Sequence, residues 1–167
     1  MRKLVCMLGC ALAIAGIGSM PARAQYGTDT DLSHNWDLRA GFFLPERQSV
    51  RAAEGDVFFT VGVERSFYDA ERWSGTISID YYGSGSVYNV PIMINARGET
   101  NRLRYGAGMG VGLSHDLTRG IAGFAYNLLV GYTLRGGPNP VFADVRYLGL
   151  ATGGDLNGWA FTLGFHF

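Results

Sequence analysis

The sequence predicts an all-β fold, an eight-stranded antiparallel up-and-down transmembrane β-barrel, on three observations. Apolar and polar residues alternate with a period of two over eight segments of about ten residues, the length that a tilted strand needs to cross a bilayer. With the exception of Arg65, charged residues inside these segments fall on the polar face. Aromatic residues gather near the segment ends, where the two membrane interfaces would lie.

The N-terminal region has the pattern of an export signal. Met1, Arg2 and Lys3 form a basic start, an apolar run covers 4–17, and the stretch SMPARA follows. This pattern predicts a signal peptide at residues 1–24, cut after Ala24. We expect residues 25–33 to form a periplasmic N-terminal segment and 34–167 to form the barrel. The alternatives are a membrane anchor, for which the apolar run is short, and a lipoprotein cut at Cys10.

Removal of residues 1–24 changes the composition of the exported chain. Cys6 and Cys10 both leave, so neither a disulfide nor thiol chemistry is expected. Arg2, Lys3 and Arg23 also leave, which reduces 14 basic residues to 11 against 14 acidic ones, a net charge of −3. This balance is not basic enough to suggest nucleic acid, and we expect no nucleic-acid partner. No later apolar run is long enough for a transmembrane helix.

Strands are expected wherever the alternation holds. At the C-terminus, Trp159, Phe161 and Leu163 share one face with two further phenylalanines, and Gly158 and Thr162 lie on the other. A soluble β-sandwich could also alternate, but it would not sort aromatic residues to the strand ends. The predicted strands are 34–44, 56–67, 72–82, 87–97, 102–114, 120–134, 140–149 and 157–167.

Charges in the middle of the predicted strands test the register. Seven of them lie on the polar face, and we expect them to form an ion-pair network inside the barrel, because buried charges must be paired. Arg65 is the exception, on the apolar face near a strand end. We expect Arg39 to reach carboxylates on other strands. The network residues are Asp37, Arg39, Glu64, Asp80, Arg104, Asp144 and Arg146.

Short turns give an expected orientation. The segments 68–71, 98–101 and 135–139 would be periplasmic if both termini are periplasmic. The outward loops would then be 45–55, 83–86, 115–119 and 150–156, of which only the first is sizeable.

A glycine-rich run at 104–114 admits three interpretations: a phosphate-binding loop, a flexible linker, or a strand that keeps one face bare. It could be a phosphate-binding loop, which needs a helix directly after the glycines. Here the apolar residues continue the strand period and no helix follows. We therefore expect a stripe of glycines that faces the lumen and makes room for Arg39 from the opposite strand: Gly106, Gly108, Gly110 and Gly112.

The runs VYNVPIMINARG, RLRYGAGMGVGLS and FADVRYLGL, with a final aromatic strand ending in Phe167, carry a resemblance to a family. The chain resembles the small eight-stranded outer-membrane β-barrels of Gram-negative bacteria, of the opacity and porin-family type, and is similar in architecture to the membrane domain of the outer-membrane protein A group. The resemblance implies an outer-membrane location and contact with outer-membrane lipid. It also implies periplasmic chaperones and an insertion machinery that reads Phe165 and Phe167.

Candidate chemistry is sparse. An acyl hydrolase would need a serine and a histidine on one face with a carboxylate. Ser114 and His115 are neighbours and so lie on opposite faces, while His34 and His166 lie on other strands. We expect no enzyme, no cofactor and no metal, and we interpret the acidic stretch at 28–31 as a solvated tail.

These observations favour a structural or cell-surface interaction role, with the lumen plugged by the ion-pair network. One alternative is a narrow pore for small ions or solutes, lined by the same charges. A second alternative is an outer-membrane lipid-modifying enzyme. A surface ligand is not identified by the sequence.

Overall fold

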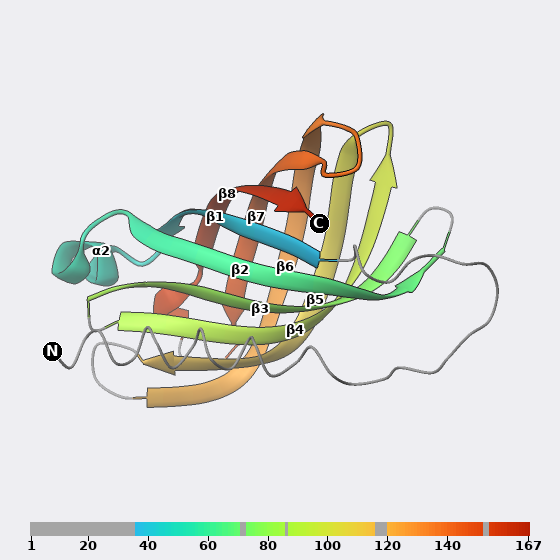
Figure 1. The fold of residues 1–167 in the computed structure, drawn as a ribbon. Helices are drawn as coiled ribbons and strands as arrows, with labels where there is room; N and C mark the ends of the chain where they lie inside the picture. The colour runs from blue at the N-terminus through green and yellow to red at the C-terminus, as the bar shows by residue number, and fades with distance from the viewer. Residues whose placement is uncertain (1–35, 71–72, 86, 116–119, 152–153) are drawn as a thin grey trace, which may run out of the picture. The chain divides into compact units, whose positions relative to one another are not determined.

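The computed structural model describes residues 36–70, 73–85, 87–115, 120–151 and 154–167. In this part of the chain, eight strands form a closed barrel (Figure 1). The predicted signal peptide and periplasmic segment, His34 and the acidic stretch 28–31 lie outside it. The elements are β1 Trp36–Pro45, α2 Gln48–Glu54, β2 Phe58–Asp69, β3 Trp73–Ser84, β4 Val87–Thr100, β5 Leu103–His115, β6 Gly120–Arg135, β7 Val141–Leu150, the 3-10 turn η3 Gly154–Leu156 and β8 Gly158–His166.

Each strand pairs antiparallel with the next one along the chain, and β1 closes the barrel against β8. Ala40, for example, lies opposite Val61 on β2 and opposite Leu163 on β8. The predicted fold class is therefore confirmed. Within the described residues, no helix has the length and apolar character needed to cross a membrane.

The barrel has two ends, which we name by what lies there. The terminal end holds the start of β1, the end of β8 and the turns β2–β3, β4–β5 and β6–β7. The loop end holds α2, η3 and the connections β3–β4 and β5–β6. In Figure 1, α2 lies beside the loop end of β2.

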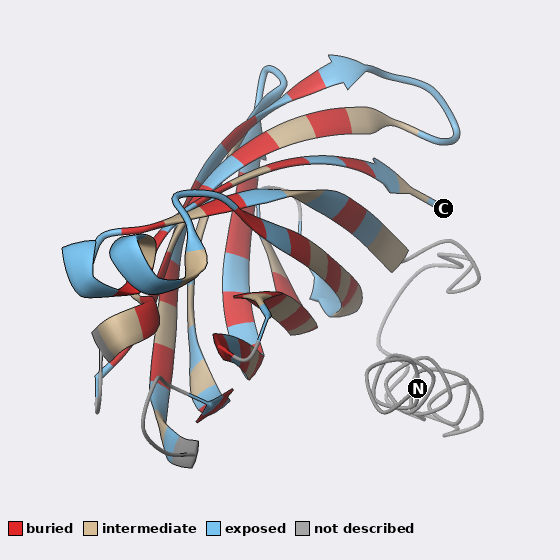
Figure 2. Ribbon diagram, turned by 90° about the vertical axis from the view of Figure 1, so that its left-hand side faces the viewer, coloured by how far each residue is buried: buried red, intermediate tan, exposed pale blue. Residues whose placement is uncertain are grey.

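Burial alternates along the strands, as the bands in Figure 2 show. Met109 and Leu163 on the outer face are 63% and 61% exposed, whereas the inward Arg39 and Arg146 are each 1% exposed. This is the reverse of a soluble domain, which buries its apolar face. An apolar outside and a polar inside are typical of a barrel that faces lipid.

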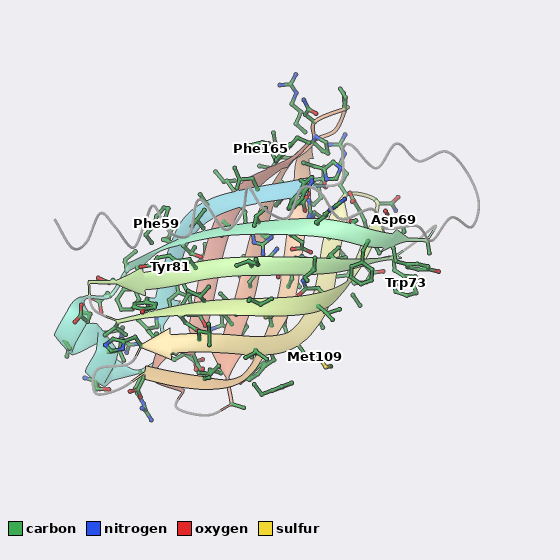
Figure 3. All side chains as sticks on the ribbon, turned by 60° about the horizontal axis from the view of Figure 1, so that its bottom comes forward. Phe59, Asp69, Trp73, Tyr81, Met109 and Phe165 are labelled. Carbon is green, nitrogen blue, oxygen red and sulfur yellow. The ribbon has the colours of Figure 1, made fainter. Side chains whose placement is uncertain are left out.

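Aromatic side chains lie near both ends of the outer face. On β3, Trp73 is at the terminal end and Tyr81 at the loop end (Figure 3). Phe59 lies toward the loop end and Phe165 toward the terminal end, while Met109 projects outward from the body of the barrel. The arrangement agrees with the two interfacial belts expected from the sequence.

Two predicted turns are shorter in the structure. β2 continues to Asp69 and β4 to Thr100, so the expected turns 68–71 and 98–101 begin inside strands. Thr100 lies opposite Leu103, and the two residues between them, Asn101 and Arg102, have φ of 50° and 73°. Positive φ at both central positions is the geometry of the tight hairpin turn whose twist matches the strands.

Segment 45–55, expected to be a loop, contains the helix α2. Its Val50 is fully buried in the apolar cluster of the loop end, and Arg51 donates hydrogen bonds to the carbonyl oxygens of Pro45 (2.8 Å) and Glu46 (2.7 Å). A helix of seven residues with one buried side chain has no apolar stripe, which is why periodicity missed it.

Candidate functional site in the barrel interior

Glu64 is the centre of the interior charge network. Its carboxylate accepts hydrogen bonds from Arg39 Nη1 (2.8 Å) and Arg97 Nε (2.6 Å), and Arg146 Nη2 lies 3.4 Å away. Arg97 Nη2 and the Thr76 hydroxyl also donate to it. Three arginines from β1, β4 and β7 therefore converge on one carboxylate of β2 that is 3% exposed.

Asp80 on β3 is the second carboxylate of this network. Arg39 holds it in a bidentate arrangement, with Nε 3.0 Å and Nη2 2.6 Å from Oδ1, and Nη2 2.8 Å from Oδ2. The planar guanidinium suits two parallel hydrogen bonds to a carboxylate. Arg39 thus reaches carboxylates on two other strands, as the sequence predicts.

Arg146 and Asp144 belong to the opposite wall, on β7. Arg146 Nη2 lies 3.4 Å from both Asp144 Oδ2 and Glu64 Oε2, and its Nη1 lies 3.9 Å from Asp80 Oδ2. These contacts link β7 to β2 and β3 across the interior. The lumen is therefore spanned by side chains from facing walls.

A second group lies at the terminal end. Asp37 accepts a hydrogen bond from Arg104 Nη2 (2.6 Å), and its other oxygen lies 2.7 Å from His166 Nδ1. Arg104 also stacks on Phe142, with its guanidinium carbon 3.6 Å from the ring centroid. Its Nε lies 3.8 Å from Asp144, which joins this group to the central one.

Neutral polar side chains extend the network. Asn127 donates to Asn95 Oδ1 (2.7 Å), and Asn95 donates to the hydroxyls of Thr76 (3.3 Å) and Ser78 (3.1 Å). Through Thr76 this chain reaches Glu64. These amides and hydroxyls satisfy one another, as buried polar groups must.

Sequence reasoning missed Arg97. It lies at the end of the predicted strand 87–97, on the same face as Asn89 and Asn95, so its parity would have placed it in the interior. With Arg97 included, the described interior holds four arginines (39, 97, 104 and 146) and four carboxylates (37, 64, 80 and 144). The formal charges of this group cancel.

The loop end of the interior is apolar, which corrects the expectation of a polar lumen throughout. Phe43, Phe58 and Tyr82 lie here, with the Phe43 ring centroid 4.4 Å from that of Tyr82 and 6.2 Å from that of Phe58. Inward positions can be apolar where a loop covers the barrel mouth. We call this cluster the apolar cap: Phe43, Val50, Phe58, Tyr82, Val87, Leu150 and Leu156.

The β5 glycine stripe faces the interior, but Arg39 does not fill the space beside it. A Cβ at Gly108 would lie 1.9 Å from Asn95 Oδ1, and one at Gly106 would lie 3.1 Å from Arg97 Cδ. At Gly112 the nearest atom is Leu150 Cδ1, at 2.7 Å, and at Gly110 it is a carbonyl oxygen of β4, at 2.0 Å. Side chains and backbone of β4, and the side chain of Leu150 from β7, occupy this space in place of Arg39.

Some buried polar atoms have no hydrogen-bond partner within the described chain. They include Arg146 Nε and Nη1, Arg97 Nη1, Asp144 Oδ1 and Thr162 Oγ1. Buried polar groups of this kind are usually satisfied by internal water. Within the central network, these atoms belong to Arg97, Arg146 and Asp144, whose other side-chain atoms form the ion pairs described above.

The two described histidines lie in different surroundings. His166 faces Asp37 at the terminal end, and His115 stacks on Tyr88 with ring centroids 5.8 Å apart. No group of three metal-ligating residues occurs among residues that the structure describes. Phe165 and Phe167, the predicted insertion signal, are exposed, with ring centroids 5.4 Å apart.

Comparison with known proteins bears on the fold. No family model matches the chain. No curated protein matches it either. The chain is similar to the solved structure of the Yersinia pestis outer membrane protein Ail in a phospholipid bilayer nanodisc, with a TM-score of 0.52 and 11% identity, over 81% of this chain and 100% of that one. It also resembles the outer membrane enzyme PagL, with a TM-score of 0.45 and 11% identity, over 78% of this chain and 97% of that one. At this identity, the likeness to Ail shows a shared barrel fold.

Proposed function

We propose that this protein is an integral outer-membrane barrel with a structural role, whose interior is closed to solutes. The observation that carries the proposal is the convergence of Arg39, Arg97 and Arg146 on Glu64, which places side chains from facing walls across the lumen. An eight-stranded barrel is only wide enough for side chains to fill it.

The outer face supports the membrane location. Large apolar side chains on it are about half exposed, among them Val130 at 58% and Leu128 at 59%. Exposed apolar area on this scale is unfavourable in water and favourable in lipid. The likeness in fold to an outer membrane protein agrees with this location.

The apolar cap supports closure at the loop end. Val50 of α2 is fully buried, and Arg47 of the same loop pairs with Asp155 of η3. Tyr147 donates a hydrogen bond to Glu46 (3.0 Å), which fastens the loop to β7. A closed apolar layer is a barrier to ions because an ion would have to lose its hydration there.

Conductance tests the proposal. The refolded protein in a planar lipid bilayer is expected to show no steady current. A variant with Phe43→Ala, Phe58→Ala and Glu64→Ala removes part of both barriers and is expected to conduct, which proves that insertion and detection work. Steady, reproducible conductance of the unmodified protein would overturn the closed interior and favour the narrow pore.

An activity assay distinguishes the lipid-modifying enzyme from the structural barrel. His166 lies beside Asp37, but Arg104 binds the same carboxylate, so this group is accounted for as an ion-pair cluster. We expect no release of fatty acid from phospholipid or lipid A by the refolded barrel. Turnover that disappears in His166→Ala, with the barrel still folded, would support the enzyme instead.

A further inference from the structure

Arg65 lies on the outer face, among apolar side chains. It follows Val61 and Val63 on the same face of β2 and lies opposite Trp36 of β1. Its guanidinium carbon is 5.2 Å from the Trp36 ring centroid, a cation–π contact. Within the described residues, no carboxylate forms an ion pair with it, in contrast to the inward arginines of the network.

The position of Arg65 along the strand places it near the terminal end. A cation on a lipid-facing surface is costly at the centre of a bilayer and tolerated at its edge, where headgroups are within reach. Trp36 is a typical interfacial residue because its ring is amphipathic. An arginine without a protein anion at this level is suited to a lipid phosphate, which guanidinium binds through parallel hydrogen bonds.

A groove of about 560 Å³ lies on the outer face over β6, β7 and β8, and it reaches β1 at Ala40 and Phe42. It is lined mainly by apolar side chains, among them Ala40, Phe42, Val130, Ala143 and Leu163. The hollow forms where outward side chains are small: Ala40 and Ala143 both lie opposite Leu163, one on each side of β8. Its size falls in the range of small-molecule sites.

Trp36 and Ala40 are separated by four residues of one strand, about 13 Å at the usual rise of a β-strand. A phosphate at Arg65 and an acyl chain in the groove are therefore compatible with a single lipid molecule. The uncompensated charge of Arg65 favours a headgroup with net negative charge over a zwitterionic one.

We propose that Arg65, Trp36 and the groove at Ala40 form a binding site for one anionic phospholipid. The site rests on the proposed function, since it requires the outer face to lie in a membrane. The phosphate binds Arg65, the Trp36 ring covers the guanidinium, and an acyl chain lies over Ala40.

Fluorescence quenching tests the site. A variant with Trp73→Phe and Trp159→Phe keeps Trp36 alone and is reconstituted in phosphatidylcholine vesicles containing brominated phosphatidylglycerol or brominated phosphatidylcholine. One arginine attracts an anionic headgroup, so brominated phosphatidylglycerol is expected to bind at Trp36 about five-fold more strongly than brominated phosphatidylcholine. The corresponding protein with Trp159 alone, at the loop end, is expected to show no preference.

Matched variants separate the two parts of the site. Arg65→Gln is expected to bring the ratio of binding of the two brominated lipids close to one. Arg135 is exposed at the same end of the barrel, and Arg135→Gln is expected to leave this ratio unchanged. Ala40→Phe fills the groove and is expected to reduce quenching by both brominated lipids. Ala107→Phe, on the outer face of β5, is the control for bulk.

The outcomes are distinguishable. Equal quenching by both lipids in the parent, or a preference that survives Arg65→Gln, overturns the site and leaves the membrane barrel intact. A surface covered by a second copy of the chain would show little quenching at Trp36, full quenching at Trp159 and a dimer on cross-linking, which also overturns it. No quenching at either tryptophan would overturn the proposed function itself.

Discussion

The carboxylate of Asp80 lies directly over Gly62, on the neighbouring strand: a Cβ at Gly62 would be 2.0 Å from Asp80 Oδ1 and 2.9 Å from Arg39 Nε. Arg39, Gly62 and Asp80 are opposite one another on β1, β2 and β3. The absence of a side chain at the middle strand allows Arg39 to cross it and bind Asp80. The space for this arginine comes from a glycine of β2.

Gly62→Ala is expected to destabilise the barrel. The added methyl group must displace an Asp80 carboxylate that Arg39 holds through a bidentate contact, and overpacking of this kind costs about 1–3 kcal/mol. Urea unfolding in lipid vesicles measures the loss. Gly136→Ala, at a β6–β7 turn position with no atom within 4 Å of the added Cβ, is expected to have no effect. Equal stability of both variants would contradict the packing described for Gly62.

Glu64→Gln is expected to be strongly destabilising. It keeps the shape of the side chain but leaves Arg39, Arg97 and Arg146 without their shared carboxylate, and breaking a buried pair costs about 3–5 kcal/mol. Adding Arg97→Gln removes one excess positive charge and is expected to restore part of the stability. Asp56→Asn removes an exposed partner of Arg51 and is expected to change the free energy of unfolding by less than about 1 kcal/mol. A double variant less stable than Glu64→Gln alone would argue against charge imbalance as the cause.

Val50→Asp is expected to release α2 from the loop end. The substitution places a carboxylate among the apolar side chains of the cap, where burial of a charge is costly. Faster trypsin cleavage after Arg47 and Arg51, measured on the refolded protein in vesicles, would report the release. Ala52→Asp changes an exposed position of the same helix and is expected to leave cleavage unaltered. Unchanged cleavage in Val50→Asp would mean that the cap does not hold the helix.

Gly110→Ala is expected to cost more stability than Gly106→Ala. The nearest atom to a Cβ at Gly110 is the backbone oxygen of Ile92, at 2.0 Å, whereas at Gly106 the nearest backbone oxygen, that of Ala96, lies at 2.7 Å. Backbone within a ladder cannot move away as a side chain can, so we expect a cost of about 1–3 kcal/mol at Gly110. Chemical denaturation of the two variants in the same lipid gives the comparison. The reverse order would contradict the described β4–β5 packing.

The alternation of residues by itself determined the two faces of each strand, and with them the number of strands and the inward position of most charges. Strand geometry is local, since successive side chains point to opposite faces wherever the chain is extended. The same rule also places Arg97 on the inward face, because Arg97 is two residues from the inward Asn95 on one strand. Parity alone, however, does not say how high a residue lies along the barrel axis.

Tertiary structure decided which charges form pairs and where the interior changes from charged to apolar. Glu64 pairs with arginines 25, 33 and 82 residues away, because the stagger between strands brings them to one level. The same stagger gathers Phe43, Phe58 and Tyr82 at the loop end, where Val50 of α2 covers them. These contacts depend on the relative displacement of whole strands and on closure of the barrel, which no local pattern of residues encodes.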